Sequence, residues 1–369
     1  MTNPFNMSED KEQHAFDLLD KNVNILSMYA YCFEVDVVGF GPWRHGPYKP
    51  AQPEMIAELN EKRKKSKLTA SVAHCFHTKM SFRDAALRIW EHHKLAEASK
   101  GDLSICKTAG DVEQCKKDGR VGMLLSWQDP NCLEYTLDLE FLDIFYQLGI
   151  RNFQITYNHR SLFGDGCCER ANAGLSEIGI KLIERMNKRG IIVDCSHAGD
   201  KTSMEAIELS KNPCIFSHSG ARAIFDDPLH HNIDDDRLKA LAEKGGTWGA
   251  DTWPPHLALS PKLPTIHDYL DQMDYVVKLV GVDTIALGPD MAEVYPAEDT
   301  EWQKKFEPGF GRMMAEHNLT LPWMPEADSL EKYLANTTLG LISRGYSDQD
   351  IQKILGGNLL RVFRRVFGS

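Results

Sequence analysis

The stretch GIIVDCSHAGDKTSMEAIELSKNPCIFSHS, residues 190–219, decides the fold class. Residues 190–196 and 213–217 are short apolar, β-branched runs, and residues 201–210 between them have the spacing of an amphipathic helix. A strand, a helix and a second strand in this order predict a βαβ unit with two parallel strands. Both runs are almost continuously apolar, which is typical of strands that are buried on both faces.

The same alternation continues in both directions along the chain. We expect further strands at residues 18–26, 69–76, 121–127, 152–157, 245–250 and 284–287. We expect further helices at residues 81–98, 135–148, 176–189, 234–244 and 266–280. Eight strands joined by right-handed helical crossovers predict a (β/α)8 barrel of the TIM type. A doubly wound open sheet is the alternative, and the absence of Gly-x-Gly-x-x-Gly after an early strand weakens it.

Length and composition are compatible with one such barrel. The chain has 369 residues, of which 42% are hydrophobic, and α/β barrels of this length fold as one domain. We therefore expect a single domain over residues 1–369, with insertions at about residues 34–67 and 291–328. Both insertions follow strands, so they are expected over the C-terminal face of the barrel, where active sites form.

Charge and hydropathy argue against several partners. The formal net charge of −11 argues against nucleic acid and anionic membranes. No stretch of about 18 apolar residues predicts a membrane span, and the polar residues 1–12 do not have the pattern of a secretory signal. Nine cysteines in a chain too long to need disulfides predict free thiols and a cytoplasmic location.

Two histidines stand at the same point of consecutive expected strands. His197 ends the run VDCSH and His218 follows IFS, and neighbouring strands lie about 4.8 Å apart, so both imidazoles can converge on one ion. Two hydrogen-bonded histidines without a metal are an equal alternative on pattern alone. Asp290 ends the apolar run IALGPD. A carboxylate there is costly unless it is paired or used, which favours a general base or a ligand over a capping residue.

Several ordered motifs accompany these residues. They are FYQLGIR (145–151), ITYN (155–158), DGC (165–167), GLS (174–176), MN (186–187), IVDCSH (192–197), IFSHS (215–219) and GGNLLRVF (356–363). Together the motifs resemble the renal (membrane) dipeptidase family, peptidase family M19, over about residues 119–290 and again near the C-terminus. The resemblance implies a (β/α)8 barrel that hydrolyses dipeptides with two zinc ions, and it implies a homodimer.

Some functional positions of that family have direct counterparts here. The resemblance implies that His197 and His218 are zinc ligands and that Asp290 assists proton transfer. Tyr157 takes the place of the family's substrate-contacting histidine, and Asn158 beside it is a further candidate substrate contact.

Other positions depart from the family's pattern. The best match to its first-metal His-x-Asp pair places Asn22 and Asn24 there, as weak ligands and candidate substrate contacts. Gln128 replaces the metal-bridging glutamate, and His231 replaces a substrate-binding arginine, for which Arg44 in the first insertion is the candidate substitute. Because neutral amides ligate weakly and supply no charge, we expect one divalent ion, zinc or another, or no ion, rather than two.

Three functions fit these observations. The first is hydrolysis of a dipeptide or small amide with one ion on His197, His218 and Gln128. Asp290 would relay the proton and Tyr157 would polarise the carbonyl group. The second is a repurposed barrel enzyme, an isomerase, lyase or tailoring enzyme, that uses the same residues with or without a metal. The third is a catalytically inactive binding protein.

Overall fold

A computed structural model describes residues 3–29, 60–75, 80–133, 139–258, 262–291 and 324–368 of the chain. Eight of the nine strands in these ranges close into a parallel barrel, because β1 pairs with both β2 and β9, and β2 also pairs with β4. In barrel order they are β1 (Ile25–Tyr29), β2 (Ala70–His74), β4 (Val121–Trp127), β5 (Asn152–Gln154), β6 (Ile192–Asp194), β7 (Ile215–Ser219), β8 (Thr247–Ala250) and β9 (Ile285–Leu287). The predicted (β/α)8 barrel is confirmed.

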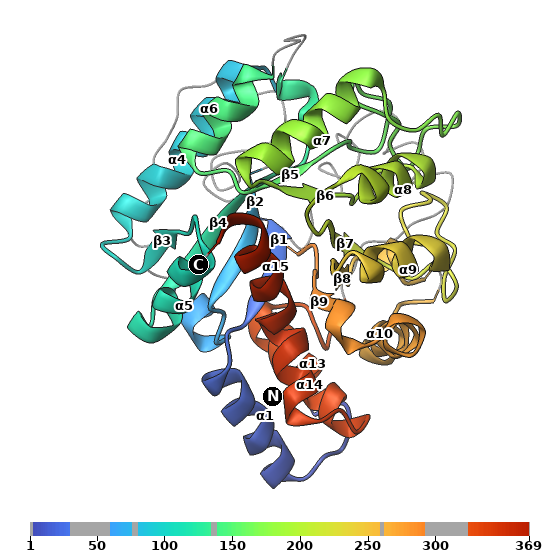
Figure 1. The fold of residues 1–369 in the computed structure, drawn as a ribbon. Coiled ribbons are helices and arrows are strands. Elements are labelled where there is room, and N and C mark those ends of the chain that lie inside the picture. The colour runs from blue at the N-terminus through green and yellow to red at the C-terminus, as the bar shows by residue number, and fades with distance from the viewer. Residues whose placement is uncertain are drawn as a thin grey trace.

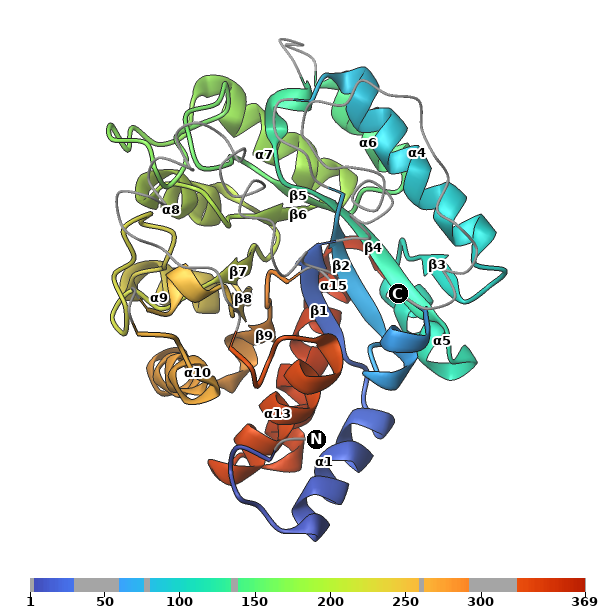
Figure 2. The same ribbon diagram turned by 180° about the vertical axis from the view of Figure 1, so that it is seen from behind.

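Helices surround the barrel on the outside (Figures 1 and 2). They are α4 (Phe82–Ala98), α5 (Ala109–Asp118), α6 (Glu140–Leu148), α7 (Glu177–Arg189), α8 (Asp200–Leu209), α9 (Asp235–Glu243) and α10 (Ile266–Val280). Hydroxyl or carboxylate side chains begin five of them by accepting a backbone N–H, as at Ser176 of α7 and Thr265 of α10. On the outer surface Asp143 of α6 accepts hydrogen bonds from Arg185 and Arg189 of α7, which ties these neighbouring helices together.

The first strand differs from its prediction. Residues 9–21 form the helix α1 (Glu9–Lys21), and β1 begins only at Ile25. Leu18 and Leu19 are buried because, with Ala15, they form the inner face of α1. A short apolar pair of this kind fits either a helix or a strand, so pattern alone assigned it wrongly.

Two further parts of the fold had no counterpart among the predicted elements. The strand β3 (Leu103–Ile105) pairs with β4 outside the closed barrel and is followed by α5. The C-terminal region forms α13 (Leu330–Ser343), α14 (Asp348–Gln352), a π-helical turn η4 (Lys353–Gly357) and α15 (Asn358–Phe367). In the two views α13 lies beside α1, below the barrel.

The C-terminal helix closes the N-terminal end of the barrel. The Asn358 amide donates to the carbonyl oxygens of Val282 and Ile285, each at 2.8 Å, where β9 begins. Arg361 donates to the Gly245 carbonyl at 2.6 Å, just before β8. The opposite, C-terminal end of the barrel is therefore the end left for a site, as the fold class predicts.

The extent of the domain stays a prediction. Most of the two expected insertions, together with Arg44, falls outside the described residues, so the single domain over residues 1–369 is not tested. Among the described helices, none combines the length and apolar character that crossing a bilayer requires.

Candidate metal centre

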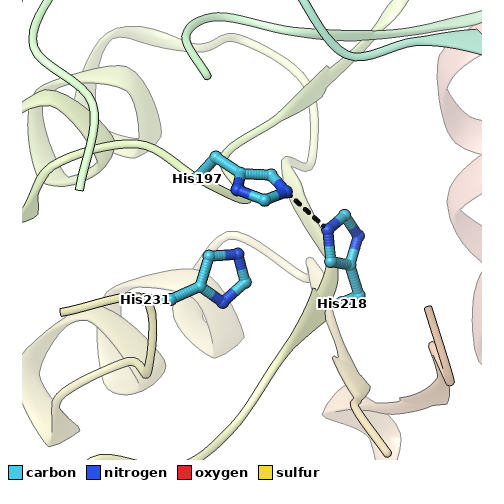
Figure 3. Close-up of side chains that lie close together, drawn as sticks. All are labelled: His197, His218 and His231. Carbon is cyan, nitrogen blue, oxygen red and sulfur yellow. Dashed lines mark hydrogen bonds between the residues drawn. The ribbon is translucent and has the colours of Figure 1, made fainter. Parts of the chain in front are cut away.

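Two neighbouring strands bring His197 and His218 together at the C-terminal end of the barrel. β6 ends at Asp194, and a turn places His197 in the left-handed region at φ +62°, while His218 belongs to β7 itself. Their Nε2 atoms lie 2.9 Å apart (Figure 3). The strand pairing thus produces the convergence that the sequence spacing predicts, whereas their role as metal ligands stays a prediction.

Each ring is also held through Nδ1, the rear nitrogen, which points away from the centre. His197 Nδ1 lies 2.8 Å from Asn158 Oδ1, and because an amide oxygen can only accept, Nδ1 is the donor. The Nε2 atom of neutral His197 therefore presents a lone pair to the centre. His218 Nδ1 lies 2.9 Å from Ser217 Oγ. An oxygen partner on the rear nitrogen is the usual arrangement of histidines that bind metal ions.

A buried polar chain supports this pair from inside the barrel. Asp194 Oδ1 accepts the backbone N–H groups of Ser196 and Ser217, both at 3.1 Å, which cross-links the ends of β6 and β7. Asn152 of β5 donates to the other Asp194 oxygen at 2.9 Å and to Ser126 of β4 at 2.8 Å. Every link is a satisfied buried hydrogen bond, so the backbone under the histidines has little freedom to move.

The same chain continues to a third strand-end histidine. His74 of β2 is bonded on both ring nitrogens, at 2.8 Å to Ser126 Oγ and at 2.9 Å to Ser27 Oγ of β1. Burial lowers its pKa to about 3. With both nitrogens occupied, His74 is a structural member of the barrel interior and is not available as a ligand.

Two further histidines complete a cluster. His231, in the connection between β7 and α9, lies with its ring centroid 4.4 Å from that of His197 and 5.5 Å from that of His218. His256 stacks on His231 at 4.2 Å with an interplanar angle of 6°, and its Nδ1 lies 2.5 Å from Asp251 Oδ2. Within the described part of the chain, two groups of three side chains have one ligand atom each within 4.8 Å of the others. They are His197, His218 and His231, and His231, Asp251 and His256.

Burial keeps the four rings neutral. It lowers the pKa of His218 and of His256 to about 4, and it holds the pKa values of His197 and His231 well below their ordinary range. Neutral imidazole is the form that ligates metals. Burial also raises the pKa of the Asp290 carboxyl to about 7, and its Oδ1 lies 3.8 Å from His218 Nε2. The cluster therefore combines uncharged ligand nitrogens with a carboxyl group that can exchange a proton near neutral pH.

Three other predicted residues lie at the same end of the barrel. The Tyr157 ring is 4.2 Å from the His197 ring, at an angle of 36°. Asn158 orients His197, as described, which is a different role from the substrate contact expected for it. Gln128 directly follows β4 and is fully buried, and neither of its side-chain polar atoms has a hydrogen-bond partner among the described residues.

Asn22 and Asn24 are not part of the centre, which corrects the alignment made from sequence. Both precede β1, at the N-terminal end of the barrel, and the Asn24 amide donates to the carbonyl oxygens of Leu19 and Lys67. The error follows from placing the first strand too early. The sequence of β1, ILSMY, contains no histidine or carboxylate, so the described part of this strand also lacks the family's first-metal ligand types.

Two residues of the cluster, Asp251 and His256, had no role assigned from sequence. The end of an expected strand does mark Asp251 as a candidate, because it directly follows β8, at the same point as the histidines of earlier strands. His256 lies in the short helix η2 (Pro254–His256), where the sequence has no period that would indicate which way the ring points.

Comparisons with known proteins find relatives in sequence and in fold. The sequence profile of the membrane dipeptidases, peptidase family M19, matches residues 55–304. The chain is 26% identical over 288 residues to Dipeptidase tcpJ from Claviceps purpurea, which covers 78% of this chain and 60% of that protein. It is 30% identical over 234 residues to Dipeptidase 3 from Rattus norvegicus, which covers 62% of this chain and 42% of that protein. The aligned part thus spans about half the length of these relatives.

A solved structure resembles almost the whole chain. An amidohydrolase from Pseudomonas aeruginosa superposes with a TM-score of 0.78 at 25% identity, over 96% of this chain and 99% of that one. The probable dipeptidase PvdM from the same organism superposes with a TM-score of 0.76 at 18% identity, a likeness that concerns the fold alone.

Proposed function

Since the chain belongs to the membrane dipeptidase family, peptidase family M19, we propose that it is a hydrolase of a dipeptide or small amide that acts with one divalent ion. One observation carries the proposal. His197 and His218 direct their Nε2 atoms at each other across 2.9 Å while Asn158 and Ser217 occupy the rear nitrogens. This is the pattern of two ligands oriented for one ion.

The residues present fit a zinc ion. With zinc–nitrogen bonds of about 2.0–2.1 Å, two ligands of a tetrahedral site lie about 3.3 Å apart, so the two rings need to separate by only a few tenths of an ångström. When bound, such an ion lowers the pKa of a water ligand to about 7 and polarises a carbonyl group. Among the described residues the family's second ion has no equivalent support, because Asn22 and Asn24 lie at the other end of the barrel.

The chain's own residues supply proton transfer and orientation. In amide hydrolysis the oxygen of water adds to the carbonyl carbon, the carbon–nitrogen bond breaks, and a proton must reach the leaving nitrogen. Asp290 Oδ1, 3.8 Å from His218 Nε2, is placed to accept a proton from the attacking water and to donate it to the leaving amine nitrogen. Tyr157 lies against the His197 ring, where its hydroxyl group can orient the carbonyl group of the substrate.

The location and the assembly of the protein are further parts of the proposal. All eight cysteines in the described ranges are free thiols, which agrees with the prediction of a reducing, cytoplasmic setting. The homodimer is implied only by the family resemblance.

Metal content and turnover test the proposal together. Inductively coupled plasma mass spectrometry on the purified protein should find about one zinc or similar ion per chain, and the double variant His197→Asn/His218→Asn should lose it. His92→Asn is the matched control, because His92 is a buried histidine on α4, outside the centre, and should retain the ion. Turnover of a dipeptide and small-amide panel should stop on chelation and return with zinc. Undiminished turnover by the metal-free protein would instead favour a repurposed acid–base enzyme, and metal-bound protein without turnover a binding protein.

A further inference from the structure

His231 lies buried beside the centre, and the proposed function assigns it no role. Its side chain is 3% exposed, and neither ring nitrogen has a hydrogen-bond partner among the described residues. A buried polar group without a partner costs about 1–3 kcal/mol. The neighbouring histidines differ in this respect, since each has an oxygen partner on Nδ1. The structure therefore maintains His231 at a cost that a ligand would offset.

The loop that carries His231 is built to hold it in place. The Asp227 carboxylate accepts the backbone N–H groups of Leu229 at 2.9 Å, His231 at 3.2 Å and Asn232 at 2.7 Å. Asn232 in turn accepts from the Gly220 N–H at 2.8 Å and donates to the His256 carbonyl at 2.8 Å. These bonds connect the loop to the end of β7 and to η2, so the backbone of His231 is fixed on both sides.

The ring of His231 is held beside His197 and His218, with a nitrogen within reach of the same ion. It stacks on His256 at 4.2 Å, and the Asp251 carboxylate and the Trp253 edge hold His256 in turn. In the close-up, one ring nitrogen of His231 faces the gap between His197 and His218 (Figure 3). One nitrogen from each of these three rings lies within 4.8 Å of the other two.

We propose that His231 is the third protein ligand of the ion held by His197 and His218, which makes the centre a site of three imidazoles and one ion. The inference rests on the proposed function. Two imidazoles are one short of the three protein ligands that a catalytic zinc ion takes beside its open position. The His231 nitrogen, within 4.8 Å of the other two, needs to approach them to about 3.3 Å, a shift on the scale of a small side-chain rotation.

A competing ion position formed by His231, Asp251 and His256 is less consistent with the geometry. Histidine directs its lone pair in the plane of its ring, and the His231 and His256 rings are parallel to within 6° and stacked, so they cannot both point at one ion between them. Both Asp251 oxygens are also engaged, by the Trp253 N–H at 2.6 Å and by His256. These residues instead position the ring of His231.

The assignment changes the kind of substrate contact expected at this position. The resemblance places a substrate-binding arginine here, whose guanidinium group would bind a carboxylate. A neutral imidazole committed to the ion provides no such contact. The position has therefore exchanged a contact with substrate for a bond to metal, and a substrate carboxylate, where there is one, must be bound elsewhere.

The test compares His231→Phe with His256→Phe. Phenylalanine keeps the stacked pair of rings in each case, and only the first change removes a proposed ligand. Zinc dissociation constants come from competition with a chromophoric chelator, and the visible absorption of the cobalt-substituted protein reports the ligand set. His231→Phe should weaken zinc by more than about 100-fold and change the cobalt spectrum. His256→Phe, which acts only on ring position, should weaken zinc by about 10–100-fold or less and leave the spectrum unchanged.

Further variants separate the possible failures, with circular dichroism confirming that each one folds. If His218→Asn abolishes binding while His231→Phe binds zinc as the wild type does, the inference is wrong and the proposed function stands. If Asp290→Asn changes the cobalt spectrum and His231→Phe does not, Asp290 is the third ligand and the inference is again wrong. If the wild type binds no ion, both proposals are wrong.

Discussion

Substitution of Gly249 by alanine should displace the strand that carries His218. Gly249 lies in β8 beside β7, and a Cβ atom there would be 2.1 Å from the Ser217 carbonyl oxygen and 3.2 Å from the Cα atom of Gly288, which follows β9. Cβ atoms do not approach other atoms to less than 3.0 Å, so the two backbones must separate by at least 0.9 Å. Because Ser217 directly precedes His218, the ligand nitrogen is expected to move by a similar distance.

The expected magnitudes follow from this displacement. Overpacking of a dense core costs about 1–3 kcal/mol, and here the obstacle is backbone, which cannot rotate away. Metal–ligand distances tolerate only about 0.2 Å, so we expect zinc affinity to fall by about 10–100-fold as well. Urea denaturation measures the free energy of unfolding, and chelator competition measures the affinity for zinc.

Gly345→Ala is the control for Gly249→Ala. Gly345 follows α13 and has φ +83°, and no atom of the described residues lies within 4 Å of a Cβ atom there. The substitution should cost about 1–2 kcal/mol through backbone strain and leave zinc affinity unchanged. If Gly249→Ala has wild-type stability and wild-type affinity, the end of β7 is not fixed by this packing and the reasoning fails.

Two more predictions concern single polar contacts. Asn158→Ala removes the acceptor of the His197 Nδ1 hydrogen bond and should raise the zinc dissociation constant by about 10–100-fold. Asn158→Asp keeps an acceptor at this position and should retain most of the affinity. Equal dissociation constants for the two variants would contradict the orienting role of Asn158. Asp143→Asn should cost about 1 kcal/mol at pH 7, because Arg189 and a second arginine hold the pKa of this carboxyl below its ordinary value of 3.8. Because the folded-state pKa is depressed, the contact stabilises the protein above pH 3.8 and ceases to do so as pH falls through the folded-state pKa. The difference in urea denaturation should therefore shrink as pH is lowered below 3.8, and a constant difference would exclude the ion pair as its cause.

The barrel could be predicted because its repeat is long and regular. α10 begins and ends where the pattern placed it, at Ile266 and Val280, since fifteen residues contain several helical turns. β4 likewise matches its predicted residues 121–127. The start of the chain could not be assigned in this way, because Leu18 and Leu19 are too short a signal to distinguish a helix face from a buried strand.

The candidate site could likewise be predicted only in part. His197 and His218 could be found from sequence because each lies at the C-terminal end of a strand region, and parallel strands end at the same face. The placement of His231 against His256 could not, since it depends on hydrogen bonds between two loops that are distant in sequence, such as the one from the Asn232 amide to the His256 carbonyl. No local pattern encodes such a contact.

The attachment of α15 beneath the barrel has a consequence for biosynthesis. Arg361 bonds the Gly245 carbonyl across 116 residues of chain, and Asn358 bonds the Ile285 carbonyl across 73. While the ribosome is still translating α15, the strands already outside the exit tunnel lack these partners, and the N-terminal end of the barrel is exposed. A nascent chain stalled before residue 358 is therefore expected to remain sensitive to proteases and available to chaperones.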